Sequence, residues 1–509
     1  MRCGPPPPPY FREVTGWIGD CFRFYWALFY WNGRKTWFRL RGAHRDDCPC
    51  QTDGDSGHAF DSRCEAVTHW HDPARFRKVC PLLVQTPQGW RCSVNAESVR
   101  PFWGRACLYG AALALGAYLI ATTAVFAALR LAHYETSYVM VAWPPRWKEL
   151  RAAQEKLYAN RAQHAVQAGN YEEAILSLEI VTQLNPRNYS AGLALAGLNQ
   201  VAGRPSVADH IYERLMREVP EQRRPTAQLW FRNLLARAAF PEMKSLATTM
   251  LSEDPAERAA WLNALLFACR QTADSARLGT VLAENPHLPD WCTELIGIEQ
   301  QLLQNQFNHA LPQLTRFHRQ PATSYIPYFQ VDRLVRHGAA GRANELLRAY
   351  GDSVPSDEAT ILRLRTYQDR GWSALVTSEF DVLLRAELTP RTVALCCAWL
   401  VAKPDPAASG QFLDRFERAN APVNAGTLSL YHAAFLVATS AGQTDRATRL
   451  AGAINHYTAS DSKALRGLGE LLRRPGPDAR VVRVLPLVPL PTEVVYAIVE
   501  RKSALPTAK

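Results

Sequence analysis

Apolar residues in the second part of this chain recur at the spacing of helix faces. The clearest example lies between residues 158 and 186, where the apolar positions are Ala165, Val166, Ile175, Leu178 and Val181. Residues three and four apart lie on one side of an α-helix, so this pattern predicts two amphipathic helices joined by a short turn.

Prolines divide the same region into units of nearly equal length. They fall at Pro186, Pro220, Pro255, Pro286, Pro321, Pro355, Pro390 and Pro422, in steps of 34, 35, 31, 35, 34, 35 and 32 residues. A period of this length indicates a pair of helices that is repeated and stacked on its neighbours. We therefore predict an all-α fold, an α-solenoid of about nine helix-turn-helix units over residues 147–472.

Glycines and alanines keep the same period. The matching sets are Gly169, Ala174 and Pro186; Gly203, Ala208 and Pro220; Gly338, Ala343 and Pro355; and Gly442 with Ala447. The glycine suits the end of a first helix, where the chain must turn. The alanine suits the contact between two helices, and the proline follows the second helix because it cannot continue one.

This arrangement resembles the tetratricopeptide repeat family. The resemblance is carried by Gly169, Tyr171, Ala174, Leu178 and Pro186, and in the next unit by Leu195, Ala196, Gly203, Ala208, Tyr212 and Pro220. Around Pro255, Pro286 and Pro390 the glycine–alanine pair is blurred or lost, and there only the period supports it. An unrelated helical bundle is the alternative.

The resemblance implies that protein partners bind a concave surface lined by the first helix of each unit. Asn199, Asn233 and Asn263 lie 34 and 30 residues apart on such helices. They are candidates for hydrogen bonding to the backbone of an extended peptide. The alternative is that they are solvated polar positions.

A run of 23 residues without a charge extends from Cys107 to Leu129, between Arg105 and Arg130. A helix of this length crosses a bilayer core of about 30 Å. Aromatic residues, which prefer the membrane interface, flank it at Phe102, Trp103, Tyr109, Tyr134, Tyr138, Trp143 and Trp147. We predict one transmembrane helix at 106–131; a buried helix of a soluble protein is the alternative.

The flanking positive charges do not fix the orientation of this helix, because three of them stand on each side. Seven cysteines precede the run, an odd number that suits a reducing compartment. We expect a single-pass protein of a bacterial plasma membrane, with a cytoplasmic N-terminus and extracytoplasmic repeats. Cytoplasmic repeats are the alternative.

Residues 1–43 contain five consecutive prolines, Pro5 to Pro9, and then an aromatic stretch with a basic end. This stretch is too charged to span a membrane. It could lie in the interface as an amphipathic helix, or its rings could form the core of a small domain.

Residues 44–105 carry the densest group of metal-binding side chains. The candidate ligands are Cys48, Cys50, Cys64, Cys80 and Cys92, with His69 or His71 as substitutes. Thiolates and imidazoles suit Zn²⁺, and a structural zinc would help so short a segment to fold. Free thiols and, in an oxidising compartment, disulfides are the alternatives.

The rest of the chain indicates binding rather than catalysis. Net charge is +11 without a long basic run, so we expect no nucleic-acid partner. We find no phosphate-binding glycine loop, nucleophile elbow or metalloprotease motif, and we expect no enzyme activity. Cys269, Cys292, Cys396 and Cys397 lie in apolar helical sequence typical of buried thiols. Residues 473–509 predict an extended, proline-rich tail, with a short strand or helix at 494–499 that caps the last repeat.

These features predict a membrane-tethered scaffold that binds other proteins through its repeats in an envelope or membrane complex. The alternative is a membrane-bound protein that responds to metal or redox state, or an enzyme, whose active part is the N-terminal cysteine module and whose repeats select partners.

Overall fold

The computed structural model describes residues 26, 33, 36–37, 40–41, 83–86, 89–92, 103–132, 134–419, 422–459, 461–474 and 476–503. The chain divides into two compact units, residues 1–157 and 158–509, which we describe separately. Among the described residues there are 23 α-helices and two short strands. The all-α class predicted for the repeat region is confirmed.

The first unit contains a β-hairpin and a long helix. Strands β1 (Leu83–Thr86) and β2 (Gly89–Cys92) are antiparallel, and Leu83 pairs with Cys92. The long helix α4 (Trp103–Leu131) is followed by α5 (Tyr138–Ala142) and the 3-10 turn η2 (Pro144–Arg146). Helix α5 packs against α4.

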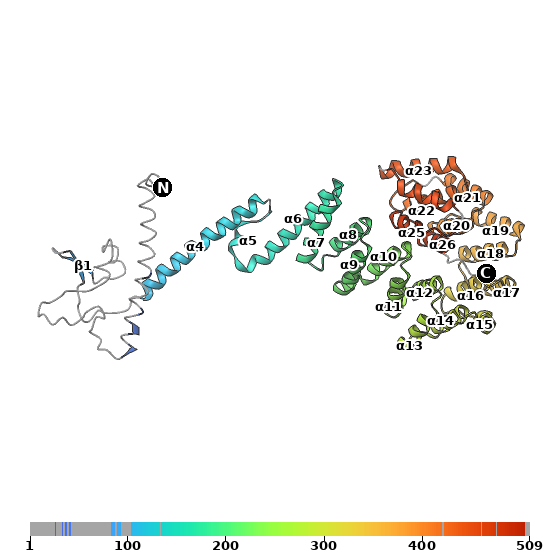
Figure 1. Cartoon of the computed structure of the whole chain (residues 1–509), viewed down its shortest axis with the longest axis horizontal. Helices are drawn as coiled ribbons and strands as arrows, with labels where there is room; N and C mark the ends of the chain where they lie inside the picture. Colours follow the sequence, from blue (N-terminus) through green and yellow to red (C-terminus); the bar gives the residue numbers. More distant parts are fainter. Residues whose placement is uncertain are drawn as a thin grey trace, which may run out of the picture. The chain divides into compact units, whose positions relative to one another are not determined.

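Consecutive helix pairs make up most of the second unit, and the first pair begins in the first unit (Figure 1). The nine pairs are α6 (Trp147–Gln167) with α7 (Tyr171–Leu184), α8 (Tyr189–Val201) with α9 (Pro205–Glu218), α10 (Arg223–Ala236) with α11 (Phe240–Glu253), α12 (Arg258–Thr272) with α13 (Ser275–Glu284), α14 (Asp290–Leu303) with α15 (Phe307–Leu314), α16 (Tyr325–Arg336) with α17 (Ala340–Tyr350), α18 (Ser356–Asp369) with α19 (Ser373–Arg385), α20 (Pro390–Ala402) with α21 (Pro406–Ala419), and α22 (Leu428–Ser440) with α23 (Thr444–Thr458). Short 3-10 turns precede four of the first helices: η2, η3 (Pro220–Gln222), η4 (Pro255–Glu257) and η5 (Gly351–Ser353).

The turn inside each pair explains the periodic glycines. Gly169, Gly203, Gly338 and Gly442 have φ between 73° and 75°, in the left-handed region that a residue without Cβ enters at little cost. Four further residues take this conformation at the corresponding turns of other pairs: Ala238, Ala273, Asn305 and Gly371. The backbone turn therefore persists in pairs where the sequence pattern is blurred.

The periodic alanines lie where the two helices of a pair meet. Ala174, Ala208 and Ala343 have no exposed surface, and Ala447 is 7% exposed. A larger side chain at these positions would push the helices apart. Four of the eight periodic prolines begin η3 or η4, lie at the N-cap of α18 or open α20, and the other four lie in connections between pairs, so all of them separate one pair from the next.

From α12 onward, the first helices of successive pairs form a continuous inner layer. Helix α12 packs against α14, α14 against α16, α16 against α18, α18 against α20, and α20 against α22. Each inner helix has a buried face; for example, eight residues of α12 and nine of α20 are buried.

The C-terminal segment differs from the extended tail that the sequence predicts. After α24 (Lys463–Arg473) come α25 (Val481–Val484), η6 (Leu485–Leu487) and α26 (Thr492–Ser503). Helix α26 packs chiefly against α20 and α10, so it lies on the inner surface of the repeats rather than only over the last one.

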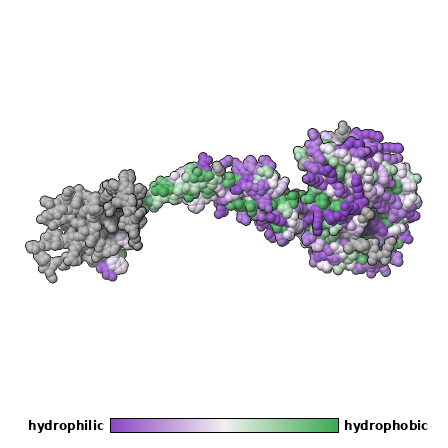
Figure 2. Space-filling model, turned by 45° about the horizontal axis from the view of Figure 1, so that its top comes forward, coloured by the Kyte–Doolittle hydropathy of each residue, from purple (hydrophilic) through white to green (hydrophobic). Residues whose placement is uncertain are grey.

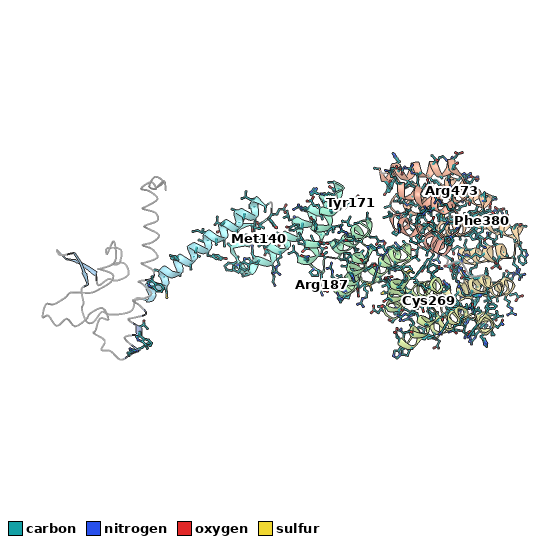
Figure 3. All side chains as sticks on the ribbon, viewed as in Figure 1. Met140, Tyr171, Arg187, Cys269, Phe380 and Arg473 are labelled. Atoms are coloured by element: carbon teal, nitrogen blue, oxygen red, sulfur yellow. The ribbon has the colours of Figure 1, made fainter. Side chains whose placement is uncertain are left out.

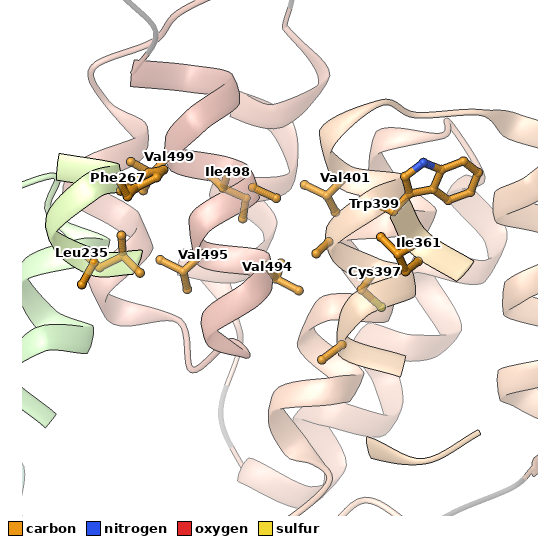
Figure 4. Packing of buried hydrophobic residues seen from close by; sticks show 14 of the residues in the cluster. Leu235, Phe267, Ile361, Cys397, Trp399, Val401, Val494, Val495, Ile498 and Val499 are labelled. Carbon is orange, nitrogen blue, oxygen red and sulfur yellow. The ribbon is translucent and has the colours of Figure 1, made fainter. Parts of the chain in front are cut away.

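The large hydrophobic core contains residues from Met216 to Val499, and α26 lies in it between α10 and α20. In Figure 4, Val494 and Ile498 face α20, whereas Val495 and Val499 face Leu235 and Phe267. Each fully buried Val or Ile side chain contributes about 1.5–3 kcal/mol to stability. The helix is therefore an integral part of the core. A second, smaller cluster fills the first two pairs.

Candidate functional site

The inner surface of the repeats encloses a cavity of about 590 Å³. Residues of α12, α16, α18, α20 and α26 line it. Its volume lies within the range of about 300–1,000 Å³ that is typical of ligand-binding pockets. Among the described residues, we regard this surface as the candidate functional site.

Charged side chains in the wall of the cavity are arranged as ion pairs. Asp332 of α16 lies 2.9 Å from Nε of Arg336 and 3.0 Å from Nη1 of Arg365. Its carboxylate also pairs with Arg333. Burial alone would raise the pKa of Asp332, but Arg336, Arg333 and Arg365 together hold it well below its ordinary value. Asp332 therefore stays ionised and links α16 to α18.

A second buried carboxylate belongs to the same network. Glu299 of α14 is 1% exposed and lies 3.7 Å from Arg270 and 3.6 Å from Arg333. These charges connect α12, α14 and α16, and buried pairs of this kind are costly to break because removing one partner leaves an uncompensated charge.

Polar contacts fix α26 across the inner surface. Glu500 pairs with Arg336, with one oxygen 3.0 Å from Nη2. Arg501 donates to the carbonyls of Val401, at 2.8 Å, and Leu472, at 3.1 Å. Lys502 donates to the carbonyls of Arg474 and Gly476. The end of α26 is thus bonded to α16, to α20, and to α24 and the segment that follows it.

Aromatic rings occupy the α12 side of the cavity. The ring of Tyr496 lies 4.6 Å from that of Phe267 at an interplanar angle of 88°, an edge-to-face contact. The hydroxyl of Tyr325 donates to Oδ1 of Asn263 at 3.2 Å. Burial raises the pKa of Tyr325 well above its ordinary value, so its hydroxyl is a donor throughout the physiological range.

Helix α8, in the second helix pair, has different residues at the positions that line the cavity in later pairs. On α16, Tyr325, Tyr328, Asp332 and Arg336 line the cavity. Counting back from the left-handed glycines at 338 and 203, the corresponding residues of α8 are Ser190, Leu193, Gly197 and Val201. The lining of the cavity includes no residue of α8.

This face of α8 is uncharged and partly open. Ser190 is exposed, Leu193 and Gly197 are half-buried, and Val201 is 61% exposed. A Cβ added to Gly197 would meet no atom within 4 Å. The α8 face, which we define as Ser190, Leu193, Gly197 and Val201, therefore offers space and small apolar groups where later repeats have charges and rings.

The three asparagines predicted from the sequence have separate surroundings. Asn199 is 1% exposed and donates to the carbonyl of Leu195 at 2.9 Å. Asn233 donates to the hydroxyl of Tyr212, also at 2.9 Å. Asn263 lines the cavity and accepts from Tyr325. Of the three, Asn263 alone lies in the lining of this cavity.

The predicted metal ligands Cys48, Cys50, Cys64 and Cys80, with His69 and His71, lie outside the described residues. Cys92 ends strand β2. Within the part of the chain that the structure describes, no group of three or more His, Cys, Asp and Glu residues is placed to hold a metal ion.

The four cysteines of the repeats are buried free thiols. Burial raises the pKa of Cys269, Cys292 and Cys396 to about 12 and that of Cys397 further. Figure 3 labels Cys269 on α12. These thiols remain protonated at neutral pH and behave as core residues.

Sequence reasoning missed the charge network, although a signal for part of it exists. Glu299, Asp332 and Arg365 each stand six residues before the left-handed residue of their turn, at Asn305, Gly338 and Gly371. Charged residues at one position of three successive repeats indicate a shared environment. Glu500, which pairs with Arg336, has no such register, because α26 lies outside the repeats.

Helix α4 of the first unit is the candidate membrane segment. The stretch Gly110–Leu131 is long and apolar enough to cross a bilayer, and only about 6% of its most apolar part is buried. Figure 2 shows hydrophobic side chains gathered on this helix. Leu108, Leu113, Leu115 and Ile120 are all more than half exposed.

The fold and these surfaces define the class as an all-α helical-repeat protein, with one candidate membrane helix in the part of the chain that the structure describes. Neither a known family model nor a curated protein matches the chain.

Proposed function

We propose that the protein is a membrane-tethered scaffold of tetratricopeptide-like repeats that binds an α-helix of a partner protein on the α8 face. The observation that carries the proposal is α26, because it is a helix bound on the inner surface of the same repeats. Its apolar residues contact the inner helices on two sides, and its charged end is held by side chains and carbonyls.

The α8 face suits a partner helix with an apolar side. It belongs to the inner surface by register, its glycine leaves room for close approach, and Leu193 and Val201 supply apolar contact. A helix laid along a shallow apolar groove is a common mode of recognition. Attachment to a membrane through α4 raises the local concentration of membrane-bound partners and so strengthens weak contacts. We place the N-terminal residues in the cytoplasm and the repeats outside it.

Capture of partners from solubilised membranes, with the full chain as bait, tests this function. Gly197→Arg is expected to abolish capture of the partner, because the new side chain extends over the α8 face and its Cβ meets no atom within 4 Å. Gly452→Arg is the matched control, since Gly452 lies on α23 and an added Cβ there also meets nothing within 4 Å.

The proposal predicts that the partner is lost with Gly197→Arg and kept with Gly452→Arg. Equal capture by both variants would show that partners bind elsewhere, and the absence of any reproducible partner with the parent chain would contradict the scaffold function itself.

A further inference from the structure

Helix α5 packs beside the C-terminal half of α4 in the first unit (Figure 1). The ring of Tyr138 meets that of Phe126 at 5.6 Å, and its hydroxyl lies 3.2 Å from the hydroxyls of both Thr122 and Thr123. At the other end of α5, the carbonyl of Ala142 accepts a hydrogen bond from the hydroxyl of Tyr118. The chain therefore turns back after α4 and descends beside it to the level of Tyr118.

Charged residues follow α5 directly. Arg146 and Glu149 form an ion pair at 3.7 Å, and both side chains are about half exposed. Trp147 donates its indole N–H to the carbonyl of Val141 at 3.2 Å, which keeps the start of α6 close to the end of α5. Lys156, farther along α6, pairs with Glu135 at 3.0 Å.

These contacts set a boundary for the bilayer. If the whole of Gly110–Leu131 lay in hydrocarbon, Arg146 and Glu149 would lie deep in the membrane beside Tyr118. Charged groups at that depth are strongly disfavoured, and here they are exposed rather than enclosed by protein. The hydrocarbon region must therefore end near Tyr118.

We infer that the bilayer surrounds residues 103–121 of α4, with Arg105 in the headgroup region and residues 106–121 in hydrocarbon, and that residues 122–131 extend into water as the support of α5 and α6. The inference rests on the membrane attachment in the proposed function and defines the surface that contacts lipid. Sixteen residues of α-helix rise about 24 Å, somewhat less than the usual bilayer core of about 30 Å.

The residue types at the two ends of this band agree with its position. Trp103 stands at one end. Tyr118, Trp143 and Trp147 gather at the other, and the two tryptophans are 59% and 55% exposed, as in an aromatic belt at a membrane interface. Figure 2 agrees, since hydrophobic colour concentrates towards the N-terminal end of α4 and hydrophilic colour increases towards α6.

Helix α5 partly covers the part of α4 beyond the band. Thr122 and Thr123 bond to carbonyls of the preceding turn and to Tyr138, and Phe126 is covered by Tyr138. Of the other seven residues, three are alanines and one is an arginine, while Leu131 is 82% exposed.

Thiol labelling of the full chain in lipid nanodiscs, where both faces of the bilayer are accessible, tests the inference. Single cysteines replace Ala112, Ala117, Ala124 and Ala128, which are all exposed and equally small. Reaction with a charged maleimide is measured as labelling beyond that of the parent chain, and Ser190→Cys on α8 supplies the rate of a thiol in water.

The inference predicts that Ala124→Cys and Ala128→Cys react at the rate of Ser190→Cys, and that Ala112→Cys and Ala117→Cys react at least tenfold more slowly. Slow reaction at all four positions would place the band over the whole of Gly110–Leu131 and overturn the inference while leaving membrane attachment intact. Fast reaction at all four would show that α4 is not in the bilayer, and would overturn both.

Discussion

The turn after α12 offers a direct test of how the repeats are built. Ala273 has φ 52° and ψ 35° and is exposed, so its methyl group gains little from packing. An L-residue in this left-handed conformation costs about 1–2 kcal/mol. Glycine removes that cost, but its greater conformational freedom stabilises the unfolded chain by about 0.4–1 kcal/mol, which offsets part of the gain. We therefore expect Ala273→Gly to raise the free energy of unfolding by about 1 kcal/mol.

Two glycines six residues apart provide matched controls. Gly203 has φ 73°, and Gly197 lies in α8; a Cβ added to either meets no atom within 4 Å. Gly203→Ala therefore introduces only backbone strain and is expected to destabilise by about 1 kcal/mol. Gly197→Ala has the opposite sign, because alanine is the better helix former by about 1 kcal/mol.

Hydrogen exchange is the appropriate assay, because repeat proteins open locally as well as globally. A change of 1 kcal/mol alters the protection of amides in the adjoining helices, α13 for Ala273 and α9 for Gly203, about fivefold. Urea unfolding of the full chain in detergent supplies the global value. Destabilisation by Ala273→Gly, or equal effects of the two Gly→Ala changes, would refute the argument that backbone conformation governs these turns.

Three further predictions, two substitutions and one thiol-labelling experiment, test the core and the charge network. Ile498→Ala, at a fully buried position of α26, should lower the free energy of unfolding by about 2–5 kcal/mol in urea. Arg336→Gln should lower it by about 1–3 kcal/mol, because Glu500 and Asp332 lose their shared partner, although Asp332 keeps Arg333 and Arg365. Folding lowers the pKa of Asp332, so its ionised form stabilises the protein above the pKa of the unfolded chain, near 4, and this stabilisation is lost as pH falls below that value. The difference in free energy of unfolding between the parent chain and Arg336→Gln should therefore become smaller in acid. Cys396 should resist maleimide in the folded chain at pH 8, because burial raises its pKa to about 12, and its contribution to stability should fall as pH rises above about 9.

Exposed counterparts serve as controls for these changes. Leu487→Ala, at a side chain 47% exposed, should change stability by less than Ile498→Ala. Arg480→Gln breaks an exposed pair with Asp478 and should cost less than about 1 kcal/mol. Equal effects within either pair, or labelling of Cys396 in the folded chain as fast as in urea, would contradict the burial on which the predictions rest.

The helix pairs are predictable from the sequence because their signals are local. Gly169 determines a single turn and has the expected left-handed conformation. Ala174 lies at a single contact between two helices and is buried, as expected. The sequence pattern was too strict elsewhere. Ala273 and Asn305 adopt the same turn without glycine, and Gly371 supplies it in the copy before Pro390, which the pattern treats as blurred. Stacking of the neighbouring helices supports a turn that local preference alone opposes.

The inner surface is less predictable because its contacts are distant in the sequence. Proline spacing indicates a tail after residue 473, yet Val494 and Ile498 pack in the centre of the repeats. A helical period shows that a segment has an apolar face but does not show which surface will cover it. For the same reason, Asn263 could be assigned to an inner helix, while its partner Tyr325 could not be named.

The position of α26 has a consequence for synthesis. The ion pair between Arg336 and Glu500 joins residues 164 positions apart. At about 5–20 residues per second, a ribosome needs roughly 8–30 s to make the second residue after the first. During that interval the earlier repeats have been synthesised, but their apolar inner faces are still exposed to solvent. Such faces can bind chaperones or associate with other chains. A chain truncated before α26 would leave these faces uncovered, so this twelve-residue helix is needed to complete the inner surface.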